Sequence, residues 1–155
     1  MGDEKMNGAC KGRFTIRSAA ALFMLSAVFE ALSVTTAMPL LGAVRSGAFV
    51  AVYHLLYTVL FLAIGVGLWV PKKWGIKAAF AGGIFYSLDK ILLLLDKSTM
   101  ETYLIQMIGD SSEIFRIIDK HTIFQGITLM YLLFIAGWWG FVGYLYLRRQ
   151  YFDVP

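Results

Sequence analysis

The chain has 155 residues, of which 59% are hydrophobic, and its formal net charge is +4 at pH 7. A soluble domain of this size has too little interior to bury so many apolar side chains, so the composition indicates a membrane protein. The basic residues stand at the ends of apolar stretches, where they set membrane orientation, and the charge therefore indicates no nucleic-acid partner. Cys10 is the only cysteine, which excludes an intrachain disulfide, a CxxC redox pair and a multi-cysteine metal site.

Four apolar stretches are each long enough to cross a bilayer, which takes about 20 mostly apolar residues. Two tails, 1–17 and 148–155, flank them and leave 18–147 as a single membrane domain. The sequence therefore predicts an all-α polytopic membrane protein whose four transmembrane helices form an antiparallel bundle. The predicted spans cover about 18–41, 48–70, 76–95 and 123–147.

Short connections join the first three spans. Pro39 lies near the outer end of the first span and is followed by Gly42 and Gly47, whereas Pro71 and Gly75 mark the inner turn between the second and third spans. Because both connections are short, we expect these spans to pack as antiparallel neighbours. Small residues in the first, third and fourth spans allow close helix approach, either within one bundle or in an oligomer.

The outer segment 96–122 is more polar than the spans that it joins. Ser98-x-x-Glu101 is typical of a capping box, Gly109 of a helix end, and Asp110-x-x-Glu113 of a second helix start. We predict two short amphipathic helices that lie on the outer interface or fold over the mouth of the bundle. They form either a plain helical linker or a functional lid.

The distribution of Lys and Arg predicts the orientation of the chain. Nine of these residues fall on the side of the two tails and the Pro71 turn, and four fall on the opposite side. The positive-inside rule therefore places both termini in the cytoplasm, in a plasma (inner) membrane. Trp69 and Trp74 flank the same turn, as expected of an interfacial aromatic belt.

Ionisable side chains stand inside three of the four spans, where a charge costs about 2.5–3.5 kcal/mol. Glu30 falls near the middle of the first span, and at about 1.5 Å of rise per residue the others fall in the outer half of the membrane. Polar groups from four helices thus converge at similar depths, which predicts an outward-facing pocket. The candidate ligand-binding residues are Glu30, His54, Tyr57, Tyr86, Asp89, Lys90 and Gln125.

The same residues also fit a purely structural network. In that interpretation Glu30 and Lys90 form a buried ion pair and Asp89 bonds to His54 or to a tyrosine, because buried charges are normally paired. One lysine among three acidic or imidazole groups exceeds the need of a single structural pair, which favours a functional pocket. A metal site is not expected, since no ligand spacing is present and Lys90 would repel a cation. The sequence identifies no cofactor.

Trp138 and Trp139 fall near mid-membrane rather than in the interfacial belt. Adjacent helical residues point about 100° apart, so at most one of them faces a pocket. We expect them to pack against small residues of the first or third span, with an aromatic floor beneath a ligand cavity as the alternative. Each indole N–H requires a hydrogen-bond partner.

Three functions are compatible with this pattern. The first, which we favour, is the binding or transport of a small molecule or lipid by the outer-half pocket. The second is a non-catalytic subunit of a homo-oligomer or larger membrane complex, and the third is a small enzyme acting on a lipid or quinone by acid–base chemistry. A transporter needs a second gate in the inner half, a subunit exposes a face of small residues, and an enzyme needs an opening to lipid beside the carboxylates. The lipid bilayer is a partner in all three cases.

Overall fold

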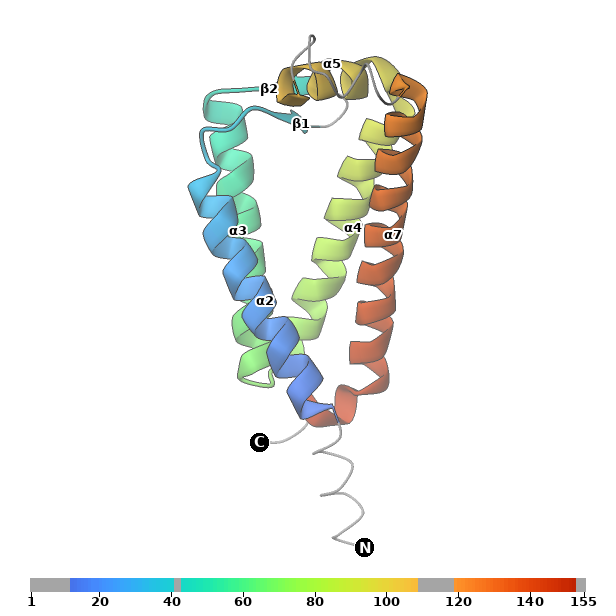
Figure 1. Ribbon diagram of the computed structural model, residues 1–155. Helices are drawn as coiled ribbons and strands as arrows, with labels where there is room; N and C mark the ends of the chain where they lie inside the picture. Colours follow the sequence, from blue (N-terminus) through green and yellow to red (C-terminus); the bar gives the residue numbers. More distant parts are fainter. Residues whose placement is uncertain (1–11, 41–42, 109–118, 153–155) are drawn as a thin grey trace, which may run out of the picture.

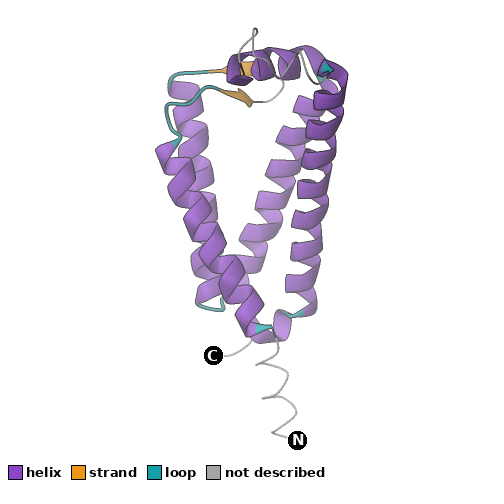
Figure 2. Cartoon of the chain, in the orientation of Figure 1, coloured by secondary structure: helices purple, strands orange, loops and turns teal. Residues whose placement is uncertain are grey.

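The structure is a computed structural model that describes residues 12–40, 43–108 and 119–152. Helices dominate this part of the chain (Figure 2). The prediction of an all-helical chain with four helices of membrane-spanning length and hydropathy is confirmed. These four helices are α2 (Arg13–Leu32), α3 (Ala48–Trp69), α4 (Lys73–Leu95) and α7 (Lys120–Leu147), shown in Figure 1.

The first helix ends well before the apolar stretch that contains it. α2 stops at Leu32, and the chain then forms a two-stranded antiparallel hairpin from β1 (Met38–Leu40) and β2 (Ala43–Arg45). Pro39 pairs with Val44 in this hairpin. Proline lacks an N–H and drives the residue before it out of the helical region, so a helix cannot run through Pro39 to the end of the apolar stretch.

The membrane helices pack in chain order. α2 lies mainly against α3, α3 against α4, and α4 against α7. The helices converge at one end of the molecule and spread apart toward the other, where α5 (Lys97–Ile108) and the hairpin lie across the opening (Figure 1). The start of α2 and the final 3-10 turn η1 (Arg149–Phe152) share the convergent end.

Glycines explain why the convergent end is narrow. A Cβ atom added to Gly75 at the start of α4 would lie only 2.6 Å from the carbonyl carbon of Gly67 near the end of α3, so the two backbones touch. Farther along α4, a Cβ at Gly83 would lie 2.8 Å from the indole of Trp138. Close backbone packing of this kind drives helix association in lipid. The hydrophobic effect adds little there, because lipid tails are as apolar as the side chains of the helices.

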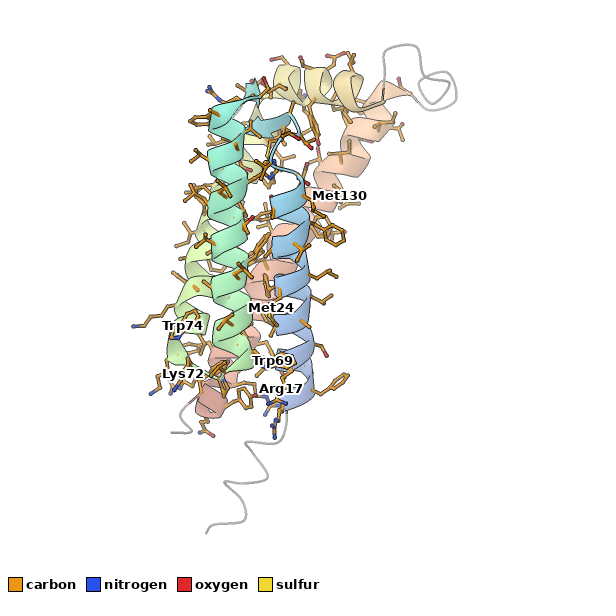
Figure 3. All side chains as sticks on the ribbon, turned by 90° about the vertical axis from the view of Figure 1, so that its left-hand side faces the viewer. Arg17, Met24, Trp69, Lys72, Trp74 and Met130 are labelled. Atoms are coloured by element: carbon orange, nitrogen blue, oxygen red, sulfur yellow. The ribbon has the colours of Figure 1, made fainter. Side chains whose placement is uncertain are left out.

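Basic and aromatic side chains gather at the convergent end. Figure 3 shows Arg17, Trp69, Lys72 and Trp74 toward the end of the bundle that lies away from α5. The Arg17 guanidinium lies 5.4 Å from the centre of the Trp69 ring, within the range of a cation–π interaction. This girdle is the one that the sequence assigns to an interface between membrane and water.

The spreading end is held by a separate apolar cluster. Leu93 of α4 packs with Met100 and Leu104 of α5, and residues such as Ile123 and Phe124 of α7 pack against them. α5 is therefore anchored over the bundle rather than free of it. The second predicted outer helix falls on residues 109–118, which lie outside the described residues.

The start of α5 is capped differently from the Ser98-x-x-Glu101 capping box that the sequence suggests. The Asp96 carboxylate accepts hydrogen bonds from the Ser98 and Thr99 backbone N–H groups at 3.0 and 3.3 Å. It also accepts the Ser98 and Thr99 hydroxyls at 2.8 and 2.7 Å. These bonds, the Thr99 side chain first, lower the pKa of Asp96 to about 2. Asp96 therefore serves as the cap.

Candidate functional site

A polar pocket lies at the spreading end of the bundle, beneath the hairpin and α5. Its volume is about 240 Å³. Five helices and the hairpin contribute to its wall, which is why its residues are scattered along the sequence. We call this site the outer pocket; it is lined by Glu30, Met38, Pro39, Tyr53, Tyr57, Phe61, Tyr86, Lys90, Tyr103 and Tyr131.

Glu30 reaches the pocket from the last turn of α2. Since that helix ends at Leu32, Glu30 lies near its outer end rather than at mid-membrane, as the longer apolar stretch suggested. One Glu30 oxygen, Oε2, lies 2.6 Å from His54 Nδ1 on α3, and the imidazole is almost completely buried. The short distance is typical of a charge-assisted hydrogen bond.

Asp89 and Lys90 form a second polar unit on α4. Asp89 Oδ2 accepts hydrogen bonds from Lys90 Nζ at 2.8 Å and from the Tyr53 hydroxyl at 2.9 Å. The side chain of Asp89 is 1% exposed and that of Lys90 is 11% exposed. The Lys90 ammonium also lies 5.7 and 5.6 Å from the ring centres of Tyr86 and Tyr131. Cation–π attraction therefore adds to the ion pair in holding this ammonium group.

The expected pairing of Glu30 with Lys90 is wrong. Glu30 pairs with His54, and Lys90 pairs with its own neighbour Asp89. The expectation that Asp89 bonds to a tyrosine is confirmed by its contact with Tyr53. The reason lies in helix packing: α2 packs extensively along α3, whereas the pocket itself separates the outer end of α2 from α4.

The two pairs place charges of opposite sign in the lining of the pocket. In each pair one member lines the pocket, Glu30 in the first and Lys90 in the second. The other member, His54 or Asp89, holds it from behind. Because each lining charge is paired, its burial is tolerated, yet one carboxylate and one ammonium group still face the same cavity.

Tyrosines fill the space between these charges. The Tyr57 hydroxyl is buried and makes no well-aligned hydrogen bond to the described residues, although its ring centre lies 4.6 Å from that of Tyr53. The Tyr53 and Tyr57 rings therefore pack against each other in the pocket wall. Tyr86 stacks on Trp138 with the ring centres 5.4 Å apart and the planes 13° apart.

Most of the sequence-predicted site residues meet here, with one exception. Glu30, Tyr57, Tyr86 and Lys90 line the outer pocket, and His54 and Asp89 bond directly to lining residues. Gln125 instead lines a different pocket of about 420 Å³, together with residues such as Lys97 and His121. It lies six residues before Tyr131, which turns it about 120° away around α7.

Several lining residues are absent from the set of candidate residues chosen from the sequence, Tyr131 and Tyr103 among them. Tyr131 lies on α7 at the depth of Lys90 and faces it, but its chemistry does not distinguish it from other membrane tyrosines. Tyr103 belongs to α5, which the sequence placed outside the membrane, and it lines the pocket because that helix lies across the opening. Burial is the main cause that raises the pKa of Tyr103, and this phenol therefore stays protonated at neutral pH.

The tryptophans pack in the expected way. Trp138 Nε1 donates to the Ala79 carbonyl at 2.9 Å, and Trp139 Nε1 donates to the Ser87 hydroxyl at 3.0 Å. Both partners belong to α4, the third span, and both indoles are therefore satisfied.

Within the described part of the chain, no three His, Cys, Asp or Glu side chains are grouped closely enough to hold a metal ion.

Comparisons of this chain with protein-family models, with curated proteins and with solved structures gave no match.

Proposed function

We propose that this chain is a small integral membrane protein whose outer pocket binds a small zwitterionic ligand, one that carries an ammonium group and an anionic group. The observation that carries the proposal is the presence of Glu30 and Lys90 in the lining of one pocket. Each keeps hydrogen-bonding capacity beyond its partner: the carboxylate has a second oxygen, and the ammonium has three N–H groups, one of which reaches Asp89. A ligand with both charges satisfies both ends.

The aromatic wall supports an alkylated ammonium group in particular. Rings of Tyr53, Tyr57, Phe61 and Tyr86 line the same cavity as Glu30. Aromatic faces attract cations, and aromatic cages are a common way to recognise quaternary ammonium groups, which donate no hydrogen bonds of their own. The anionic end of the ligand then lies against Lys90. At about 240 Å³, the pocket is smaller than typical drug-sized sites of roughly 300–1,000 Å³, so it suits one small head group.

The proposed setting is a plasma membrane, with both termini in the cytoplasm and the outer pocket on the extracytoplasmic side. The girdle of Arg17, Trp69, Lys72 and Trp74 at the convergent end supports this orientation, because cytoplasmic span ends are enriched in basic residues. α5 and the hairpin then cover the pocket from outside.

Binding is better supported than transport. The convergent half of the bundle is filled by fully buried apolar side chains, among them Ile16, Ile64, Leu68 and Leu145. The contact between Gly67 and Gly75 closes the backbone at the same end. A transporter requires a second opening there, and this packing argues against one.

Phosphocholine is the probe that tests this function. Ligand-observed NMR is used to measure its affinity for the full chain in nanodiscs of anionic phosphatidylglycerol, with Glu30→Gln as the test variant and Glu101→Gln, an exposed carboxylate on α5, as the matched control. A charge-assisted contact is worth about 1.5–3 kcal/mol, so Glu30→Gln weakens binding about tenfold or more while Glu101→Gln does not. Equal affinity in both variants, or no binding by the native chain, contradicts the proposal.

A second function, that of a membrane-complex subunit, is favoured by the surface of α7. Only 6% of the residues in the apolar 18-residue stretch of this helix are buried within the chain. A Cβ added at Gly126, Gly137, Gly140 or Gly143 meets no atom within 4 Å, so these glycines pack against nothing among the described residues. A face of small residues is what a helix needs to approach a partner closely. Gly143→Cys in a Cys10→Ser chain tests the homo-oligomer form of this function: disulfide-linked dimers in native membranes support self-association, and exclusively monomeric chains contradict it.

A further inference from the structure

Another cavity lies between α2 and α7, the two helices at the free edges of the bundle. Its volume is about 420 Å³, and we call it the lateral groove. Leu22 and Phe23 of α2 form one wall, and Leu133 and Phe134 of α7 form the other. The groove exists because α2 and α7 do not pack extensively against each other, so the sequence of packed helix pairs does not close into a ring.

The lateral groove and the outer pocket share one residue. Tyr86 of α4 lines both cavities. Trp138, which stacks on Tyr86, lines the groove and meets the edge of Phe23 at a centroid distance of 5.5 Å. Tyr86 is therefore the side chain at which the apolar groove adjoins the pocket that contains Lys90.

The two cavities are arranged like the head group and the acyl chains of one membrane leaflet, with the polar pocket toward one end of the helices and the apolar groove nearer their middle. On α2 the groove residues, from Ala19 to Ser26, lie on the convergent side of Glu30, and on α7 they lie on the convergent side of Tyr131. The stretch from Leu133 to Phe141 spans about 12 Å of helix rise, close to half of a hydrocarbon core of about 30 Å. A molecule held in both cavities has its polar end near the membrane surface and its apolar end near the bilayer centre.

We infer that the ligand is an amphiphile of the outer leaflet: a phospholipid with a zwitterionic head group in the outer pocket and one acyl chain in the lateral groove. This inference rests on the proposed function and adds its substrate class. Two observations select a lipid over a free zwitterion: the lining of the groove is apolar apart from Ser26 and Tyr86, and it opens toward the bilayer. Charge complementarity with Glu30 and Lys90 selects a zwitterionic head over an anionic one.

Native mass spectrometry of the full chain tests this inference. The protein is released from nanodiscs that contain equal amounts of phosphatidylcholine and phosphatidylglycerol, and the retained lipids are counted. Gly137→Leu projects a side chain into the groove, and Gly140→Leu is its matched control on the same helix, outside the groove. A Cβ at either glycine meets no atom within 4 Å, so both positions have open space where the new side chain begins.

The native chain and Gly140→Leu are expected to retain one phosphatidylcholine in preference to phosphatidylglycerol. In Gly137→Leu the ratio of the two retained lipids falls to one, while phosphocholine still binds with unchanged affinity. Equal selectivity in Gly137→Leu and the native chain overturns the inference and leaves the proposed function standing. If the native chain binds neither phosphocholine nor phosphatidylcholine, the inference and the proposed function are both overturned. A dimer that Gly137→Leu dissociates identifies the occupant of the groove as a second copy and also overturns the inference.

Discussion

The pairing of Asp89 with Lys90 makes a quantitative prediction about stability. Replacing Lys90 with methionine keeps an unbranched apolar side chain but removes the ammonium group. Asp89, whose side chain is 1% exposed, then loses its paired cation and keeps the Tyr53 hydroxyl, the other of the two hydrogen-bond donors described above. Removing one partner of a buried pair costs about 3–5 kcal/mol because the other charge is left uncompensated.

The double variant Asp89→Asn/Lys90→Met removes both charges together. The introduced asparagine still accepts the Tyr53 hydroxyl through its amide oxygen, so the loss is close to that of a single hydrogen bond, about 1 kcal/mol. The double variant is therefore expected to be more stable than Lys90→Met alone. The two substitutions are strongly non-additive, as expected for residues in direct contact.

Unfolding by sodium dodecyl sulfate in mixed micelles, followed by helical circular dichroism, gives the free energies for this cycle. Glu30→Gln combined with Lys90→Met is the control pair, because Glu30 is bonded to His54 rather than to Lys90. Because Glu30 and Lys90 line the same pocket, we expect coupling in that pair too, but smaller than the coupling between Asp89 and Lys90, which are in direct contact. Additive losses for Asp89 and Lys90, or a coupling between Glu30 and Lys90 as large as theirs, would refute the pairing derived from the structure.

Other parts of the fold make three further predictions. Because hydrogen bonds depress the pKa of Asp96 from 3.8 to about 2, its capping contribution is complete above about pH 4 and is lost as the pH falls through about 2; a carboxyl ¹³C titration checks this, and Thr99→Val should shift the midpoint upward. Gly75→Ala should lower stability in the same micelle assay, because its Cβ would lie 2.6 Å from the Gly67 backbone, whereas Gly140→Ala should not. In a Cys10→Ser chain, Ser98→Cys should react with an impermeant thiol reagent from outside the cell and Lys72→Cys should not; the reverse pattern contradicts the proposed orientation.

The membrane helices could be predicted from sequence because their signal is local. Length and hydropathy locate α3, α4 and α7 to within a few residues. The same signal places the outer end of α2 too far along the chain, since apolar residues continue through Pro39 into the hairpin. Hydropathy reports which side chains tolerate lipid, whereas the end of a helix depends on backbone chemistry.

From the sequence, the site could be predicted only as a set of residues at similar depths in the membrane. Helical rise brought Glu30, His54, Asp89 and Lys90 to similar levels, and the structure does bring these residues around one pocket. Which of them pair depends on helix rotation and on which helices are neighbours, and a single sequence contains neither. The same limitation explains Gln125, whose depth is suitable but whose side of α7 is not.

The third function suggested by the sequence, an enzyme acting on a lipid or quinone, stays a prediction. The lateral groove provides the lipid opening that such an enzyme requires, and Glu30 bonded to His54 provides an acid–base pair in the outer pocket, which shares Tyr86 with the groove. Neither feature identifies a reaction. A change in a bound lipid during incubation with the native chain, absent with His54→Gln, is the result that favours catalysis over binding.

The central claim is that the outer pocket surrounds an ammonium group with tyrosine rings beside Glu30. Its most direct test is to measure nuclear Overhauser effects between the methyl protons of bound phosphocholine and the aromatic protons of the full chain in phosphatidylglycerol nanodiscs. The account predicts cross-peaks to the rings of Tyr53, Tyr57 and Tyr86, which line the pocket. Cross-peaks to His121 and Phe124, which line the pocket that contains Gln125, would contradict it, as would the absence of any aromatic cross-peak from bound phosphocholine.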